Sequence, residues 1–202
     1  MKAMQHLFQS LDTSVPIWDS TFMVAPLVLI GTKEADNYDM APKHMAGPVG
    51  FDNYFGFVCT PKHATYHNVL KTKFFTVSFP LPDTIVATSL AASQRDTVIS
   101  KYKNVLKALP LEKAQTMDAM FLKDSYLRLE CELFKVIDGF GENSIITGKI
   151  KVAQVLDEYR RISERDEQDQ LVKDPLFVYI SPGRFAKITK TYNFPFPKDF
   201  KR

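Results

Sequence analysis

The sequence lacks most features of secreted, membrane-spanning and nucleic-acid-binding proteins. It has two cysteines, Cys59 and Cys131, in 202 residues, which do not make a disulfide framework. The first 25 residues contain no continuous apolar segment of the kind that a secretory signal requires. No apolar run approaches the roughly 18 residues that span a membrane. The formal net charge is +3, from 26 basic and 23 acidic residues, too small and dispersed an excess to favour nucleic acid. We therefore expect a cytoplasmic protein without membrane or nucleic-acid partners.

Signature loops of several enzyme classes are also missing. The chain contains no Gly-Lys-Ser or Gly-Lys-Thr phosphate loop, and no Gly-x-Ser-x-Gly turn, which argues against a serine hydrolase of the α/β type. The Gly139-Phe140-Gly141 segment precedes a β-type pattern instead of a helix. It therefore predicts a hairpin turn and not a dinucleotide loop.

What the chain does have is enough apolar material for one core. Hydrophobic residues make up 45% of the sequence, which excludes a disordered chain. A length of 202 residues is typical of one domain, and we expect residues 1–202 to form a single domain.

Alternation of apolar and polar residues, the period of a β-strand, dominates the pattern. A loop from Asp138 to near Ser144 is expected to join two of the strands as a hairpin. No regular strand–helix–strand rhythm appears, which favours an antiparallel barrel or sandwich with inserted helices over a doubly wound sheet. The predicted strands are residues 22–31 (interrupted by Pro26), 51–59, 73–80, 126–138, 145–156 and 176–181.

Helical patterns occupy less of the chain. A short helix is predicted at residues 64–72. Residues 83–110 are predicted to be mainly helical and to stop at Pro110. The densely charged residues 157–170 are interpreted as a solvated helix or loop, and Pro182-Gly183 as a turn after the last strand. The helical spacing within 83–110 is carried by Val98, Tyr102, Val105 and Leu109.

Thr65 and Asn68 lie three residues apart at the start of the predicted helix, so their side chains share one face. Free N–H groups and the helix dipole attract an anion at that end. With Lys62 and His63 just before them, they could clasp a phosphate. The alternative is that Thr65 caps the helix and Asn68 bonds to a neighbouring loop.

Residues 39–44, Asp-Met-Ala-Pro-Lys-His, follow a polar turn. Ala41 and Pro42 are small and would let a ligand approach the backbone. Lys43 and His44 could place donors near a ring that becomes anionic on reduction. The alternative interpretation is an exposed loop.

Cys59, His63 and His67 form a second alternative. Their C-x3-H-x3-H spacing places the two histidines on one helical face, a usable geometry for zinc. A structural zinc site needs a fourth ligand, and no second cluster stands nearby in the sequence.

The order of these features resembles the flavin reductase-like family, which has the FMN-binding split-barrel fold and includes flavoredoxin. The resemblance covers roughly residues 20–190. Asp39 stands where the family often has asparagine. The matching segments are Pro26–Thr32 (opening strand), Asp39–Pro42 (similar to Asn-x-Ala-Pro), His63–Val69 (the Thr-x-x-Asn helix), Phe74–Pro80, Leu129–Leu133 (Leu-x-Cys) and Ile145–Ile150.

The resemblance implies a mainly β (α+β) fold, an antiparallel split β-barrel with inserted helices. It also implies a homodimer with each FMN near the subunit interface. Electrons would pass from NAD(P)H through FMN to flavin or another redox partner. By analogy, His63, Thr65 and Asn68 would hold the phosphate and ribityl chain. The residues expected near the isoalloxazine are Met40, Ala41, Pro42, Lys43, Cys59, Thr60 and Phe185.

The chemistry of such a protein belongs to the flavin, and the protein supplies position and electrostatics. No catalytic residue is therefore assigned. Two other functions stay open: an FMN-binding electron carrier without NAD(P)H turnover, and a zinc-stabilised binding module.

Overall fold

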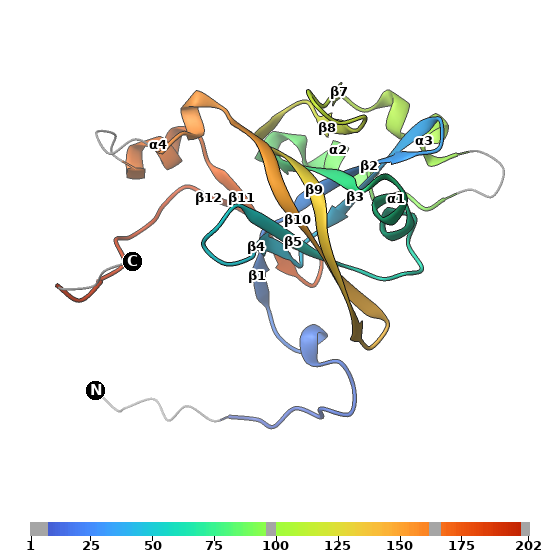
Figure 1. The fold of residues 1–202 in the computed structure, drawn as a ribbon. Helices are drawn as coiled ribbons and strands as arrows, with labels where there is room; N and C mark the ends of the chain where they lie inside the picture. The colour runs from blue at the N-terminus through green and yellow to red at the C-terminus, as the bar shows by residue number, and fades with distance from the viewer. Residues whose placement is uncertain (1–7, 96–99, 162–166, 199–202) are drawn as a thin grey trace, which may run out of the picture.

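The computed structural model describes residues 8–95, 100–161 and 167–198. Its centre is a seven-stranded antiparallel sheet in the order β3-β2-β6-β9-β10-β5-β4 (Figure 1). The strands are β1 (Met23–Ala25), β2 (Val28–Glu34), β3 (Asn37–Lys43), β4 (Ala46–Pro48), β5 (Tyr54–Cys59), β6 (Phe74–Pro80), β7 (Leu111–Lys113), β8 (Met120–Leu122), β9 (Ser125–Phe140), β10 (Asn143–Val155), β11 (Leu176–Ser181) and β12 (Arg184–Ile188). The α-helices are α1 (Ala64–Thr72), α2 (Ile85–Leu90), α3 (Lys101–Asn104) and α4 (Glu167–Lys173).

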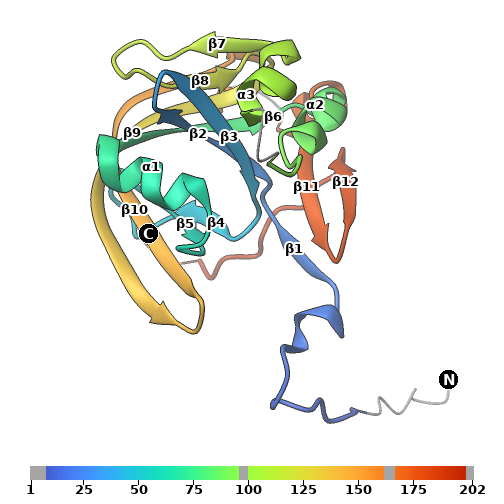
Figure 2. The ribbon, with the colours of Figure 1, turned by 90° about the vertical axis from the view of Figure 1, so that its right-hand side faces the viewer.

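The large sheet curls into a barrel that stays open along one seam (Figure 2). Its two edge strands are β3 and β4, which follow each other in the chain but are not paired with each other. Helix α1 packs against β2, β3 and β6. The predicted fold class, an antiparallel split barrel with inserted helices, is therefore confirmed.

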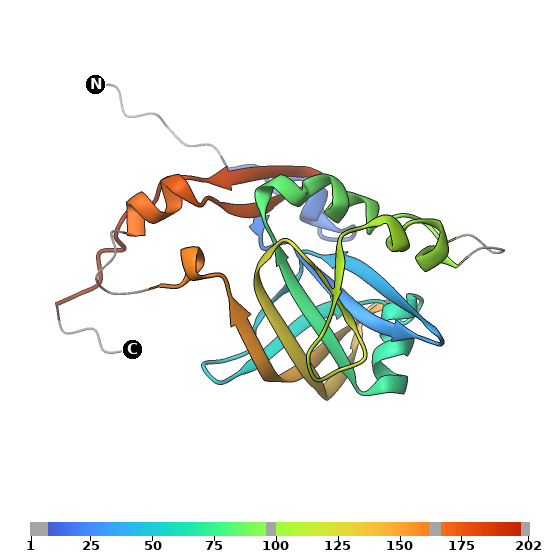
Figure 3. The same cartoon turned by 90° about the horizontal axis from the view of Figure 1, so that it is seen from above.

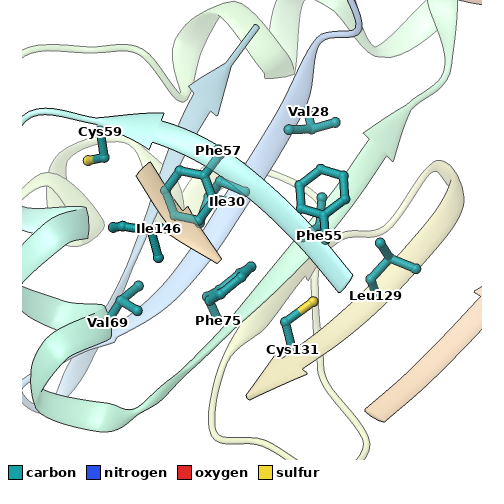
Figure 4. Packing of buried hydrophobic residues seen from close by; sticks show 11 residues of the cluster. Val28, Ile30, Phe55, Phe57, Cys59, Val69, Phe75, Leu129, Cys131 and Ile146 are labelled. Atoms are coloured by element: carbon teal, nitrogen blue, oxygen red, sulfur yellow. The ribbon is translucent and has the colours of Figure 1, made fainter. Parts of the chain in front are cut away.

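The barrel interior is filled from alternate positions of its strands, as strand geometry requires. Phe55, Phe57 and Cys59 point inward from β5, and the ring of Phe57 meets that of Phe75 edge-on at 5.2 Å (Figure 4). A Cβ on Gly148 would lie 2.6 Å from Cζ of Phe75. The aromatic packing therefore requires a glycine at that point of β10.

The β7–β8 hairpin covers the β2 and β6 side of the barrel. Thr76 on β6 donates a hydrogen bond to the Met120 carbonyl on β8 at 2.6 Å. Glu130, fully buried on β9, accepts bonds from the Gln115 and Thr116 backbone N–H groups at 2.7 and 2.9 Å. Charge-assisted bonds of this kind offset the cost of burying the carboxylate.

A second, three-stranded sheet lies beside the barrel in the order β1-β11-β12 (Figure 3). Strand β1 forms its edge, and Ala25 pairs with Tyr179 on β11. In the part of the chain that the structure describes, no helix is long and apolar enough to cross a membrane.

The predictions for helix α1 and for strands β6, β10 and β11 are confirmed, with ends that differ by two residues at most. The predicted strand at 22–31 is wrong as one unit. Pro26 separates β1, which joins the three-stranded sheet, from β2 in the barrel. Strand β5 begins at Tyr54, three residues later than predicted. The Met-Ala-Pro segment lies within β3, so the exposed-loop interpretation is wrong.

The mainly helical prediction for residues 83–110 is wrong in its extent. Within the described residues, only α2, α3 and two short 3-10 turns are helical there; Val98 lies outside them. Of the apolar residues at helical spacing, Tyr102 and Leu109 pack against a second core cluster that includes Leu106. The predicted loop at 138–144 shrinks to a turn at Gly141 and Glu142, because β9 runs on to Phe140. The range 157–170 contains a 3-10 turn and the start of α4, and residues 162–166 lie outside the described chain.

Candidate functional site

A pocket of about 390 Å³ opens where α1 begins. The helix starts at Ala64 with His63 as its N-cap, and no side chain caps its free N–H groups. The interpretation of Thr65 as the cap is therefore wrong. An uncapped helix start facing a pocket is a candidate binding site for an anion. The wall is formed by β3, the α1 start and a segment after α2, contributing Asp39, Ala41, Pro42, Lys43, Lys62, His63, Ala64, Thr65, residues 91–95 and Lys101.

Four charged side chains are joined at this pocket, Asp39, Arg95, Lys101 and Glu34. Asp39 is 3% exposed, and its carboxylate lies 3.1 Å from Arg95 Nη2 and 3.3 Å from Lys101 Nζ. Lys101 Nζ also donates to the Met40 carbonyl at 2.7 Å, and Arg95 Nη1 to Glu34 Oε1 at 2.7 Å. Burial lowers the pKa of Lys101 while Asp39 opposes that shift. The network holds two cations at the pocket with one buried carboxylate between them.

A second pocket, of about 320 Å³, adjoins the first and shares Pro42, Lys43 and His63 with it. Its lining has no carboxylate. The two pockets together make one candidate site, with Arg95 and Lys101 at the first pocket and Met45 and Val58 at the second. The further lining residues are His44, Met45, Val58, Cys59, Thr60 and Asn143.

Titratable groups between the pockets are shifted toward their neutral forms. Burial, and then the charge of Lys43, lowers the pKa of both His44 and His63. Burial raises the pKa of the Cys59 thiol, which is 1% exposed. At neutral pH the site therefore offers neutral imidazoles and a thiol, with its positive charge on lysine and arginine.

Most of the predicted binding residues come together here. Ala41, Pro42, Lys43, His63 and Thr65 line the first pocket, and Cys59 and Thr60 line the second. Three others do not line either pocket. Asn68 donates to Thr32 Oγ1 at 3.0 Å, and Met40 is buried in the second core cluster. The ring of Phe185 lies 5.6 Å from that of Phe177, centroid to centroid, in the three-stranded sheet.

Two charged pocket residues were not predicted from the sequence, Arg95 and Lys101. They lie in a stretch whose pattern gave only helical periodicity. The signal that points to them is the buried carboxylate of Asp39, which needs partners. A buried Asp39 requires cationic partners from elsewhere in the chain, and Arg95 and Lys101 are these partners.

The zinc alternative finds no support in the arrangement of its residues. Across residues 8–95, 100–161 and 167–198, no three His, Cys, Asp or Glu side chains gather closely enough to hold a metal. Cys59 is buried at the second pocket, His63 occupies the N-cap position of α1 without a capping bond, and His67 is exposed on the helix. Both cysteines are free thiols.

The antiparallel split barrel, with a pocket at the start of α1, is the architecture of a flavin reductase-like protein. The chain belongs to the flavin reductase like domain family, whose model matches residues 20–169. This confirms the predicted family. No curated protein matches the sequence at a significant level.

Solved structures share the fold over nearly the whole chain. The 2-nitrobenzoate 2-nitroreductase of Pseudomonas fluorescens superposes with a TM-score of 0.76 at 18% identity, covering 96% of this chain and 99% of that one. Flavoredoxin from Methanosarcina acetivorans gives 0.73 at 16% identity, covering 96% and 97%. An FMN-binding protein from Thermus thermophilus gives 0.71 at 16% identity, covering 94% and 99%. At these identities the likeness concerns the fold.

Proposed function

We propose that the protein is an FMN-dependent oxidoreductase that passes electrons from NAD(P)H to flavin or another acceptor. One observation carries the proposal. Two adjoining pockets reach from the uncapped start of α1, where Arg95 and Lys101 supply positive charge, to Cys59. Adjoining pockets with positive charge at one of them can accept a flat ring that carries a phosphate tail. Family membership and the FMN-binding relative support the same reading.

The residues present are chemically suited to FMN. Each pocket lies within the range of about 300–1,000 Å³ typical of ligand sites. Arginine and helix N–H groups are the usual partners of a phosphate. Ala41 and Pro42 leave the backbone of β3 accessible to a flat ring, and the pocket beside them is lined by Met45 and Val58. The buried carboxylate of Asp39 would face the polyol chain, whose hydroxyls can donate to it.

When bound, FMN supplies hydride and single-electron chemistry. The chain's own residues would bind and orient it. Thr65, Arg95 and the first N–H groups of α1 would hold the phosphate, and Asn68 would position the helix through Thr32. Lys43 would keep a positive charge beside the ring, which favours a reduced, anionic form.

We also propose that the protein works as a homodimer. Strands β5, β10 and β9 present an outward face on which Val58, Ile145 and Ile137 stand in one row, because they are paired across the sheet. Val58 also lines the second pocket. An apolar face beside a binding site is a common place for a second subunit.

A visible absorption titration with FMN, followed by anaerobic addition of NADH or NADPH, tests the function. We expect perturbed flavin bands on binding and bleaching by at least one nucleotide. Binding without bleaching by either nucleotide would favour the electron carrier. An unperturbed FMN spectrum and no retention on desalting would overturn both.

FMN affinity should rise as pH falls from about 8 to 6.5, because of His63. Burial and Lys43 lower the pKa of the free imidazole, so it is neutral at pH 8. A bound phosphate would raise that pKa, and binding then takes up a proton as pH falls between the two values. A difference of one pKa unit corresponds to at most about tenfold. Fluorescence titration should show this slope, and His63→Gln should flatten it; an equal slope in both proteins would exclude His63.

A further inference from the structure

Residues 8–22, which precede β1, carry several exposed apolar side chains. In this N-terminal arm (residues 8–22) every residue is exposed except Ile17, which is half-buried. Phe8 is 99% exposed, Phe22 68% and Trp18 52%. Figures 1 and 2 show the arm leading away from the barrel. Apolar side chains gathered on an exposed segment mark an interaction element.

The C-terminal end of the arm lies near the candidate site. It continues into β1, where Ala25 pairs with Tyr179 of β11. The ring of Tyr179 lies 4.9 Å from that of His44, and His44 lines the second pocket. Fully extended, the 15 residues from 8 to 22 would span about 50 Å. The arm is therefore rooted near the pocket and long enough to cross onto another molecule.

A complementary surface exists on the barrel. The outer sheet face of β4–β5–β10–β9 carries exposed Phe134 (62%), Val49 (44%) and Ile137 (39%). Val49 lies over Gly56, since a Cβ there would meet Val49 Cγ2 at 2.8 Å, and Phe134 contacts the ring of Tyr54 at 4.8 Å. We define the outer sheet face by Val49, Tyr54, Val58, Phe134, Ile137 and Ile145.

The charges of the two elements are opposite. The arm carries Asp12 and Asp19 and no lysine or arginine. The strands of the outer sheet face carry exposed Lys135, Lys149 and Lys151 together with exposed Glu132. Glu132 stands opposite Lys149 and pairs with Lys151 at 3.1 Å, so these four side chains have a net positive charge. Complementary charge steers association and fixes its orientation.

We infer that the arm of one subunit packs on the outer sheet face of a second copy of this chain, next to that copy's flavin pocket. Trp18 and Phe22 are the apolar anchors of the contact, as aromatic residues commonly are. The inference rests on the homodimer proposed above. It adds which segment makes the contact and which surface receives it.

Trp18 is the only tryptophan of the chain, so intrinsic tryptophan fluorescence reports the arm alone. We expect Trp18 emission to be blue-shifted in the dimer and red-shifted in the monomer, followed over a dilution series by fluorescence and analytical ultracentrifugation together. Phe134→Gln should weaken self-association at least tenfold and move the emission to the red. The matched control Val172→Gln, at an exposed valine of α4, should change neither.

Three results would overturn the inference: a dimer whose tryptophan emission is that of an exposed indole, a monomer with blue-shifted emission, or a monomer at every concentration. A dimer with an exposed indole would mean that the arm is free, and a monomer with blue-shifted emission would mean that the arm covers its own chain. A shortened protein starting at Met23 should dimerise at least tenfold more weakly. FMN titration of the full-length and the shortened protein separates the two proposals. If neither protein binds flavin, the result counts against the proposed function and not against the arm.

Discussion

Replacing Gly31 by alanine should destabilise the barrel by about 3 kcal/mol, an upper value for forced overpacking. Gly31 is central in β2, paired with Met40 on one side and Thr76 on the other. A Cβ there would collide with the Met120 backbone carbonyl and with Thr76 Oγ1. Neither neighbour can move easily, because the Thr76 hydroxyl donates to that same carbonyl. The expected fall in Tm is about 6–12 °C for a chain of this length.

The matched control is Gly47→Ala in β4. A Cβ on Gly47 meets nothing within 4 Å, and surface changes of this kind usually stay within about 0.5 kcal/mol. Both variants are compared by urea denaturation followed by circular dichroism. Equal midpoints for the two proteins would show that β8 does not press on β2 as described.

Replacing Arg95 by alanine should weaken FMN binding about 10- to 100-fold. Hydrogen bonds to charged groups contribute about 1.5–3 kcal/mol, and Arg95 is the cation at the pocket wall whose guanidinium geometry matches a phosphate. The fold should survive, because Asp39 keeps Lys101 as a partner at 3.3 Å. Isothermal titration calorimetry or flavin fluorescence measures the change, with the Tm recorded beside it.

Two further variants separate a phosphate contact from general charge. Arg95→Lys should recover part of the affinity, since it keeps the charge and loses the bidentate geometry. Lys187→Ala removes a cation that pairs with Asp83 at 2.9 Å away from the pocket, and it should leave binding unchanged. If Arg95→Ala binds FMN as tightly as the unaltered protein, the phosphate lies elsewhere.

The sequence predicted those parts of the fold in which local pattern and tertiary environment agree. The alternation in β6, β9 and β10 reflects one buried face, so strand and hairpin were recognisable. Residues 83–110 misled the prediction because Tyr102, Leu106 and Leu109 are apolar for a core cluster shared with Met40 and Met120. These residues reach the cluster from a short helix and a 3-10 turn, so their spacing does not reflect one continuous helix.

The candidate site divides in the same way. His63 and Thr65 were predicted because an anion site at a helix start has a local signature, and the structure places both at the pocket. Asn68 has the same local signature but turns to Thr32. Arg95 and Lys101 reach the pocket through the buried carboxylate of Asp39. Only tertiary folding brings that group to them, so no spacing rule can reveal it.

The order of strands in the barrel constrains how the chain reaches its native state. β5 pairs with β4 on one side and with β10 on the other, where Tyr54–Cys59 meets Ser144–Lys149. During synthesis, some 85 residues must follow β5 before β10 exists, and until then one edge of β5 is unpaired and its inward phenylalanines are uncovered. Such long-range closure is slow, and an uncovered edge strand invites association with other chains. Nascent or prematurely terminated chains that end before β10 will therefore depend on chaperones to stay out of aggregates.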